Sequence, residues 1–580
     1  MADLRAFLQS IPADYPNHLA GLKPQRSALS GRPCLLAGLV LLCLLPRTLM
    51  ALKTQVVCPD GVLYIHLARA LSEGDLEGGF QQMRLNTFPA LLVGLHHLGL
   101  DWNVAGKVWG VVISSLVVLP MYGWARRQFD DRVALVACLL YAVHSGLIEW
   151  SPELIRDPTF WFLFMLSIYL LWRAVTEVSL GLFVAVGGAI TLASLTRVEG
   201  LFLFIPLVLW SASRWRALRQ SRPRLLLGAV CGVGFFPALL LLVNVIWLRH
   251  HPHWEFMRSA PLELVQTWFQ SLAESGLGAA ADSGRGGGEV QARMSPHQSM
   301  WVFVHTMERG LTPLFALLMF GGNWAWRRVW WRQDTRPLFY VALAVAAGMW
   351  IHLYHAQMSS HRYPLPIVLM GCVFAALGLL GLSAWMLRLA DRLHWGRRLQ
   401  SAVALAPLLV VGGVGLADAL TNNYDTRESW ARLGHWIGQE FGPSPSLIGP
   451  EGLAPTASYY AQGECLTFAG GVDDQSIVQS VREFRPDVVL LWTTEVMSPG
   501  GPAMVGQIEK LGFRHVAGAE LPPGTERVFV LAQTGTELRV AQKSTRSRLG
   551  RSPTFVRPRR VGGASSQPTT SGSGIPAKEG

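Results

Sequence analysis

Long apolar runs recur along most of the chain, and they constrain its fold more than any other feature of the sequence. A transmembrane helix needs about 20 mostly apolar residues. Only 15% of the 580 residues are charged, whereas a soluble domain carries about 25%. We therefore predict a polytopic α-helical membrane protein with about 11 transmembrane helices. The predicted spans are 33–52, 104–124, 133–149, 158–174, 180–196, 198–212, 225–248, 301–322, 338–354, 363–388 and 401–418.

Arginine clusters in alternate loops predict the orientation. They follow the second, sixth, eighth and tenth spans, and the positive-inside rule places such loops in the cytoplasm. The N-terminal segment 1–32 is then cytoplasmic, and residues 33–418 form a transmembrane domain with outward-facing loops at 53–103 and 249–300. We predict a multi-pass protein of the cell membrane. Its net charge of +12 follows from this topology rather than from nucleic-acid binding.

The chain changes character after the last span. Between 427 and 534, short β-branched runs alternate with helical patterns, which predicts a small extracytoplasmic α/β domain at 419–535. This domain shows no phosphate loop, nucleophile elbow or dinucleotide fingerprint, so we expect a recognition or packing module. Residues 536–580 are rich in Ser, Arg, Gly and Pro and predict a disordered basic tail.

The first outward loop begins with Cys58-Pro59-Asp60-Gly61-Val62-Leu63-Tyr64. The apolar runs at 61–71 and 88–100 are too short to span a membrane and predict helices lying in the interface. Asp60 precedes the first of them, with Tyr64 one turn later. A carboxylate at the mouth of a membrane cavity can serve as a general base. Asp before an apolar run is also a common helix cap, so both interpretations stay open.

The second outward loop carries three acids, Glu149, Glu153 and Asp157. Acids held this closely between two apolar spans must face protein or a wet cavity. Glu153 and Asp157 are four residues apart, so they could share a helical face and hold a sugar hydroxyl or a divalent cation. The alternative is a solvated loop without a chemical role.

Two arginines occur on the face where the positive-inside rule predicts few. Arg197 and Glu199 lie between the fifth and sixth spans, and His361, Arg362 and Tyr363 open the tenth. Guanidinium groups in these places suit bidentate binding of a phosphate at the membrane surface. The alternatives are an internal ion pair between Arg197 and Glu199, and interface anchoring by Arg362 and Tyr363.

Taken together, these motifs resemble those of the GT-C superfamily of membrane glycosyltransferases. The closest resemblance is to glycosyltransferase family 39, the protein O-mannosyltransferase and aminoarabinose transferase group. It covers about residues 30–390. The resemblance rests on Asp60, the acidic loop from Glu149 to Asp157, Arg-x-Glu-Gly at 197–200 and His-Arg-Tyr-x-x-Pro at 361–366.

The resemblance implies a membrane glycosyltransferase that takes a sugar from a polyprenyl or dolichyl phosphate. The acceptor, which is a lipid, a glycan or a protein, then reaches the site from outside. Asp60 is expected to take the acceptor's proton while the sugar inverts, and Arg197 and Arg362 to neutralise charge on the phosphate. Because a phosphate already leaves as a stable anion, one base suffices. The expected substrate-binding residues are Tyr64, Glu149, Glu153, Asp157, Arg197, Glu199, His361, Arg362 and Tyr363.

One position departs from the family pattern. Family members commonly carry Asp-Glu at the first-loop motif, whereas this chain has Asp60-Gly61. The missing acid makes a divalent cation an open expectation rather than a requirement, with Glu153 or Asp157 as its candidate ligands.

Two other classes of function stay open. A transporter would show internal repeats and ionisable residues near the membrane midplane, whereas here most ionisable groups collect at one interface. A non-catalytic assembly subunit is the third hypothesis, and the uncharged Gly61 is the best argument for it.

Overall fold

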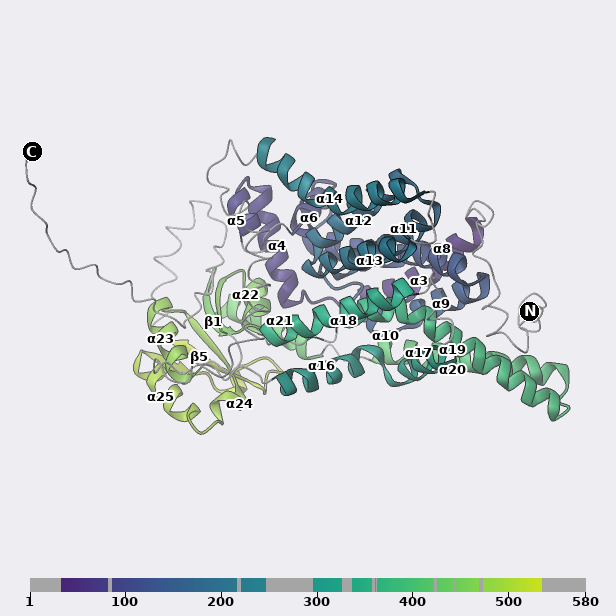
Figure 1. Ribbon diagram of the computed structural model, residues 1–580. Helices are drawn as coiled ribbons and strands as arrows, with labels where there is room; N and C mark the ends of the chain where they lie inside the picture. The colour runs from purple at the N-terminus through teal and green to yellow at the C-terminus, as the bar shows by residue number, and fades with distance from the viewer. Residues whose placement is uncertain are drawn as a thin grey trace, which may run out of the picture. The chain divides into compact units, whose positions relative to one another are not determined.

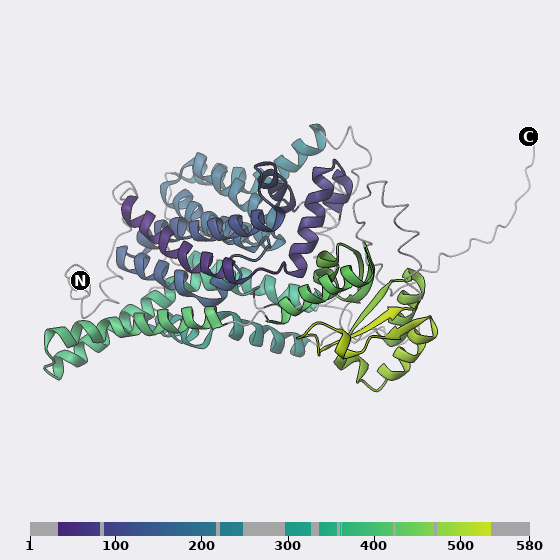
Figure 2. The same cartoon turned by 180° about the vertical axis from the view of Figure 1, so that it is seen from behind.

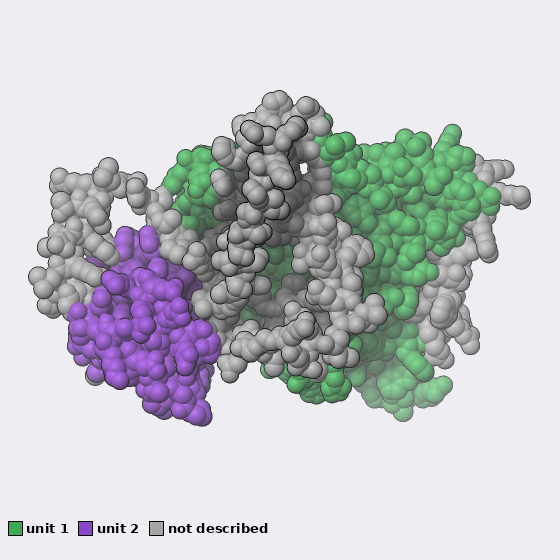
Figure 3. Space-filling view, turned by 60° about the vertical axis from the view of Figure 1, so that its left-hand side comes forward, with its two compact units in different colours: residues 1–423 green, residues 424–580 purple. Residues whose placement is uncertain are grey.

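The computed structural model describes residues 33–81, 86–215, 221–246, 296–325, 336–356, 360, 362–421, 425–442, 444–468 and 473–534. The chain divides into two compact units, Met1–Asn423 and Tyr424–Gly580 (Figure 3). The N-terminal segment 1–32, most of the outward loop 249–300 and the tail 536–580 lie outside the described residues, so the predictions for them remain predictions.

The described part of unit 1 is helical (Figures 1 and 2). Its elements are α3 (Pro33–Lys53), α4 (Pro59–Ser72), α5 (Leu76–Gln81), α6 (Phe88–His97), α7 (Trp102–Leu116), α8 (Val118–Gln128), α9 (Asp131–Val143), α10 (Ser145–Glu149), α11 (Asp157–Glu177), α12 (Leu180–Thr196), the 3-10 helix η2 (Val198–Leu203), α13 (Phe204–Arg214), α14 (Arg222–Ile246), α16 (Pro296–Leu311), α17 (Pro313–Ala325), α18 (Arg336–Ala356), α19 (Leu365–Arg392) and α20 (Arg397–Thr421).

Six helical segments of the described residues are long and apolar enough to cross a membrane. They are Pro33–Lys53, Trp102–Gln128, Asp157–Glu177, Arg222–Leu239, Leu365–Arg392 and Arg398–Thr421. A multi-pass helical membrane protein is therefore the fold class. The count of eleven spans is a finer statement that remains a prediction.

Several predicted spans are interrupted. The run 301–322 divides into α16 and α17 because Thr312 has a φ of 56°, and the residue before a proline such as Pro313 is disfavoured in the helical region. The run 133–149 divides at His144, whose backbone is extended. The run 198–212 starts with the 3-10 helix η2 rather than an α-helix.

Glycines let the helices α17 and α19 pack with their backbones in contact. A Cβ added at Gly322 would overlap the carbonyl oxygen of Phe374, and one at Gly378 would overlap that of Leu318. Small residues are the usual means by which membrane helices approach this closely, since the lipid supplies no hydrophobic drive to associate. Both helices contribute to the large apolar core of unit 1.

Unit 2 contains a five-stranded sheet with the strand order β2-β1-β3-β5-β4. β1 runs parallel to β2 and β3, and β5 runs antiparallel to β3 and β4. The strands are β1 (Ser446–Pro450), β2 (Glu464–Phe468), β3 (Val488–Trp492), β4 (Phe513–His515) and β5 (Val528–Gln533), and the helical elements are α21 (Asp425–Glu440), α22 (Ala454–Ala461), α23 (Asp474–Phe484), α24 (Thr493–Val496), α25 (Gly501–Lys510) and η6 (Gly518–Glu520).

Successive strand residues face opposite sides of this sheet, as the period of a strand requires. Leu447 and Leu490 pack with α21 and α22, whereas Ile448 and Leu491 pack with α23 and α25. Unit 2 is thus an α/β layer structure in which helices cover both faces of the sheet.

Replacing Gly378 by valine should lower the thermal stability of the protein in detergent. The added side chain has to displace the backbone of α17, and overpacking of this kind costs about 1–3 kcal/mol. Gly381→Val on the same helix is the matched control, because a Cβ at Gly381 meets no atom within 4 Å. Equal melting temperatures for the two variants would contradict the close packing of α17 on α19.

Candidate active site

Helix α4 presents Asp60 without using it as a cap. The N-cap of α4 is Cys58, whose Sγ accepts a hydrogen bond of 3.3 Å from the backbone N–H of Gly61. The carboxylate of Asp60 instead forms an ion pair with Arg362, with 2.5 Å between Oδ2 and Nη2. The alternative in which Asp60 serves only as the helix cap is therefore wrong.

Gly61 fills the position of the second acid in the family motif, and packing explains why it is small. A Cβ there would lie 2.9 Å from Cγ1 of Val57 and 3.2 Å from the carbonyl oxygen of Leu154. A glutamate there would have to displace Val57 and Leu154. Leu154 belongs to residues 150–156, which we call the acidic loop. The close packing of Val57 and Leu154 is thus a local reason for a glycine at this position.

The acidic loop is not helical, so the helical face predicted for Glu153 and Asp157 is wrong. α10 ends at Glu149, residues 151–156 are bends, and Asp157 is the first residue of α11. Pro152 has no N–H to donate and disfavours a helical conformation at Ser151, which ends the helix. Glu153 is buried and interacts electrostatically with Lys107 of α7.

Arg197 lies between α12 and η2 and is enclosed by two carboxylates. Its Nη1 pairs with Asp157, and its Nη2 and Nε contact Glu199, the latter at 3.2 Å. Only 6% of Arg197 is exposed. Burial alone would lower the pKa of this guanidinium, but Asp157 and Glu199 hold the pKa well above its usual value. The internal ion pair with Glu199 therefore exists, and Asp157 extends it.

Arg362 is less enclosed than Arg197. Its guanidinium carbon lies 5.7 Å from the ring centre of Trp150 and 5.8 Å from that of Tyr363. Burial would lower the pKa of Arg362, and the nearby Asp157 and Asp60 raise it above its ordinary value overall. Arg197 lies 5.2 Å from the same Tyr363 ring. One aromatic ring thus contacts both guanidinium groups.

Tyr64 completes this arrangement on α4. Its side chain is buried and meets Phe88 of α6 edge to face, with 5.1 Å between ring centres. Burial raises the pKa of Tyr64 to about 12, while Arg156, Asp60, Asp157 and Arg362 are close enough to act on it. Its hydroxyl therefore stays protonated and can donate a hydrogen bond near the carboxylates.

The structure brings together most of the residues singled out in the sequence. We define the ion cluster as Asp60, Asp157, Arg197, Glu199 and Arg362, and Tyr64 and Tyr363 lie against it. Glu149 is half-buried at the end of α10, Glu153 interacts electrostatically with Lys107, and His361 lies outside the described residues.

Sequence reasoning missed Trp150 and Arg156. The ring of Trp150 faces the guanidinium of Arg362. Arg156 is half-buried beside Asp157 and acts electrostatically on Tyr64 and Glu199. The available signal was the position of both residues inside the acidic segment 149–157.

Asp157 pairs with Arg197, and Glu153 interacts electrostatically with Lys107, so a divalent cation held by these two carboxylates stays a prediction. Within the described ranges of the chain, no group of three or more His, Cys, Asp or Glu side chains is arranged to hold a metal ion.

Comparisons with known proteins bear on the family. Residues 91–241 match the family model described as dolichyl-phosphate-mannose-protein mannosyltransferase. An undecaprenyl phosphate-alpha-4-amino-4-deoxy-L-arabinose arabinosyl transferase of Pseudomonas aeruginosa is 26% identical over 340 residues, which are 56% of this chain and 54% of that protein. The corresponding protein of Pseudomonas paraeruginosa is 26% identical over 359 residues, 58% of this chain and 57% of that one. The chain thus spans about half the length of the curated relatives it matches.

Two solved structures share the fold. ArnT from Cupriavidus metallidurans, crystallised with undecaprenyl phosphate, superposes with a TM-score of 0.51 at 15% identity over 88% of this chain and 99% of its own. The oligosaccharyltransferase AglB from Archaeoglobus fulgidus has a TM-score of 0.50 at 12% identity over 86% of this chain and 74% of its own. The predicted resemblance to the family 39 GT-C glycosyltransferases is confirmed.

Only part of the ion cluster lies within the segment that matches the family model. Asp157, Arg197 and Glu199 fall inside residues 91–241, whereas Asp60 and Arg362 fall outside. The contact between Asp60 and Arg362 comes from the folded chain and not from the matched segment.

Asp157→Asn should lower the stability of the protein more than an equivalent change at the surface. Removing one partner of a buried ion pair costs about 3–5 kcal/mol, and we expect the lower end because Glu199 remains. The measurement is the free energy of unfolding in detergent.

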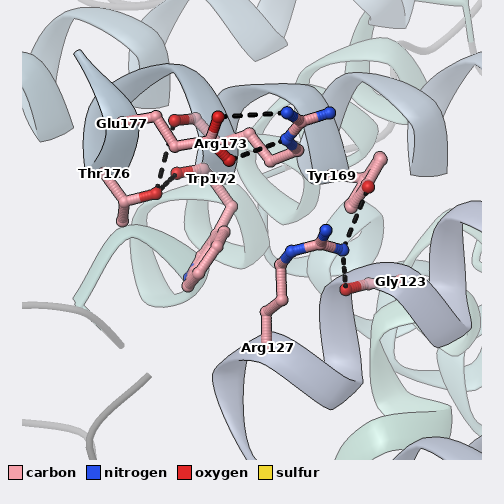
Figure 4. A network of polar contacts seen from close by, with 7 residues as sticks. All are labelled: Gly123, Arg127, Tyr169, Trp172, Arg173, Thr176 and Glu177. Atoms are coloured by element: carbon pink, nitrogen blue, oxygen red, sulfur yellow. Dashed lines mark hydrogen bonds and ion pairs between the residues drawn. The ribbon is translucent and has the colours of Figure 1, made fainter. Parts of the chain in front are cut away.

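Glu177→Gln is the matched control for this change. It breaks the half-exposed pair with Arg173 at 2.8 Å (Figure 4), and such pairs contribute at most about 1 kcal/mol. If both variants lose the same stability, Asp157 does not hold Arg197 in a buried pair.

Proposed function

We propose that this protein is a membrane glycosyltransferase. It moves a sugar from a polyprenyl-phosphate donor to a lipid, glycan or protein acceptor on the extracytoplasmic face, and it inverts the anomeric carbon. The proposed topology has a cytoplasmic N-terminus, about eleven spans and an extracytoplasmic α/β unit 2. The undecaprenyl phosphate named for the relatives and for the solved ArnT structure supports a polyprenyl donor.

The ion pair between Asp60 and Arg362 is the observation that carries this proposal. It joins a carboxylate that can accept a proton to a guanidinium that can bind a phosphate. The Asp60 side chain remains 42% exposed, so an acceptor hydroxyl can approach it from outside. The pair lies beside further acids and aromatic rings, as a sugar-binding site requires.

The proposed step balances with Asp60 as its single base. The acceptor oxygen attacks the anomeric carbon, and its proton passes to the Asp60 carboxylate. The bond from the anomeric carbon to the phosphate oxygen breaks, and its electron pair leaves with the polyprenyl phosphate. The leaving group needs no proton because it is already an anion, which distinguishes this step from glycoside hydrolysis.

Arg362 is a better candidate than Arg197 for binding the phosphate, although the sequence analysis gave both arginines this role. Nε and both Nη atoms of Arg197 are engaged by Asp157 and Glu199. Arg362 uses Nη2 for Asp60, while its buried Nε has no hydrogen-bond partner among the described residues. A buried donor without a partner is costly, and a phosphate oxygen would satisfy it.

Donor binding and base release are coupled in this arrangement. The phosphate and Asp60 would share the same guanidinium, so a bound donor draws Arg362 away from the carboxylate. Asp60 is then free to accept the hydrogen bond of the acceptor hydroxyl. Arg156 lies close enough to add positive charge on this side of the cluster.

The assembly-subunit hypothesis loses its main argument. It rested on the uncharged Gly61, and contacts with Val57 and Leu154 account for a glycine there. The transporter hypothesis is disfavoured because the ion cluster lies at helix ends, at the starts of α4, α11 and η2, rather than midway along helices.

Asp60→Asn should abolish most sugar transfer. A positioned general base contributes typically about 10²–10⁴-fold to the rate, and an amide cannot take the proton. The assay measures release of polyprenyl phosphate by purified protein from a panel of polyprenyl-phosphate sugars. Asp101→Asn is the control, because Asp101 only caps α7 by accepting from the backbone N–H of Asn103 at 2.9 Å, and Asn caps equally well.

Two results would refute this assignment. If wild-type protein releases no lipid phosphate from any donor, the enzyme hypothesis fails. If Asp60→Asn works as fast as wild type, the base lies elsewhere.

Arg362→Met and Arg197→Met should have different effects. The first should weaken binding of undecaprenyl phosphate by about 10- to 100-fold, since hydrogen bonds to charged groups contribute about 1.5–3 kcal/mol. The second should mainly lower the melting temperature, because it leaves Asp157 and Glu199 buried without their cation. Undecaprenyl phosphate affinity and melting temperature are measured on both variants. If Arg197→Met weakens phosphate binding and Arg362→Met mainly lowers the melting temperature, the phosphate-binding role belongs to Arg197 instead.

A further inference from the structure

Arg47 is a fully buried cation in the C-terminal half of the apolar helix α3. A charged side chain at membrane depth costs several kcal/mol, so such residues are rare and mark functional positions by default. Neither the proposed step nor the ion cluster uses Arg47.

The guanidinium of Arg47 joins three segments of unit 1. Its Nε donates to Oγ of Ser151 at 3.1 Å, its Nη1 to the carbonyl of Cys43 at 3.1 Å, and its Nη2 to the carbonyl of Tyr141 at 3.4 Å. The guanidinium carbon lies 4.6 Å from the ring centre of Tyr141. Among the described residues, no carboxylate forms an ion pair with Arg47, so neutral acceptors and one ring hold this charge.

Ser151 is the contact of Arg47 that leads to the active site. It is fully buried, and its hydroxyl also donates to the carbonyl of Leu147. On its other side, its carbonyl lies so close to α7 that a Cβ at Gly110 would overlap it. Ser151 therefore contacts α3, α10 and α7 at once.

The residues before and after Ser151 in the chain contact the two arginines of the ion cluster. Trp150 immediately precedes Ser151 and faces the guanidinium of Arg362. The acidic loop continues from Ser151 to residue 156, and the next residue, Asp157, pairs with Arg197. A shift of Ser151 would be passed to both arginines through a loop that has no regular secondary structure of its own.

We propose that Arg47 is a positioning residue that fixes Ser151, and through it the acidic loop, so that Trp150 and Asp157 stay aligned with Arg362 and Arg197. The proposal rests on the proposed function for its catalytic consequence. Arg47 touches neither sugar nor phosphate in this role. Its charge is retained because a guanidinium reaches a hydroxyl and two carbonyls at once, which no apolar side chain can do.

The test compares Arg47→Met, Ser151→Ala and the double variant. Misplacing a catalytic group by about 1 Å can cost about 10²-fold in rate. We expect kcat to fall at least about tenfold in Arg47→Met and the donor KM to rise, because Trp150 contacts the guanidinium of Arg362 that is proposed to bind the donor phosphate. The double variant should be no slower than Arg47→Met alone, because both changes remove the same contact.

Arg127→Met is the matched control. Arg127 is also buried, donates from Nη1 to the carbonyl of Gly123 at 3.2 Å and to the hydroxyl of Tyr169 at 3.0 Å, and lies over the Tyr169 ring (Figure 4). It thus has the same kinds of contacts as Arg47 but joins α8 to α11 and does not touch the acidic loop. This variant should keep the wild-type kcat even if its melting temperature falls.

Hydrogen exchange of the peptide spanning 145–156 gives a readout that does not require activity. Arg47→Met should speed exchange there about tenfold and leave the α11 peptide 165–175 unchanged, whereas Arg127→Met should leave 145–156 unchanged. If Arg47→Met does not fold, Ser151→Ala gives the same comparison. Unchanged exchange at 145–156, or an equal rise everywhere, would overturn the proposal.

The two hypotheses fail in different ways. If wild type turns over no donor, the proposed function fails and hydrogen exchange alone decides whether Arg47 fixes the loop. If wild type is active but kcat is unchanged in Arg47→Met, the positioning role fails and the proposed function stands.

Discussion

The buried pairing of Arg197 with Asp157 and Glu199 is the interaction on which the site depends. Charges inside an apolar helical protein persist only when they are paired, since each unpaired ion costs several kcal/mol. This requirement brings the end of α12, the start of η2 and the start of α11 to one point, although Asp157 and Arg197 are forty residues apart in the chain. Because two acids surround one guanidinium, the group carries excess negative charge. That excess attracts Arg362, whose raised pKa reflects Asp157 first among its carboxylates.

Tyr363 allows the two arginines to lie near each other. Like charges in a low dielectric repel, but the faces of an aromatic ring attract cations. The ring lies 5.2 Å from the guanidinium carbon of Arg197 and 5.8 Å from that of Arg362. Asp60 and Glu199 then balance the outer sides of the pair. The ion cluster thus combines three carboxylates with two guanidinium groups, and its two most exposed members are Asp60 and Arg362, which a substrate can reach.

The sequence predicts most helices of this fold and singles out the residues that the structure brings together in the ion cluster, because apolar run length and Arg-x-Glu spacing are local signals. The β-branched runs at 446–449 and 527–532 likewise coincide with β1 and β5. β4 was missed because Phe513–His515 is too short to show a period of two. The conformation of the acidic loop could not be predicted either, since it depends on Arg47 and Gly110, which lie far away in the sequence. Long-range contacts of this kind leave no mark in residue spacing.

Three of the arginines in this region differ in burial, and their burial determines what each can do. Arg47 is completely enclosed and contacts only neutral groups, so it can hold backbone but cannot meet a substrate. Arg197 is 6% exposed, and each of its three nitrogens contacts a carboxylate, so it can hold the helix ends together. Arg362 keeps 18% of its side chain exposed and a donor unused, so it alone can exchange one anion for another. A guanidinium suits all three tasks because it stays charged in each environment and offers five donors in a fixed plane. What each arginine does is therefore decided by how many of those donors the surrounding chain has already engaged.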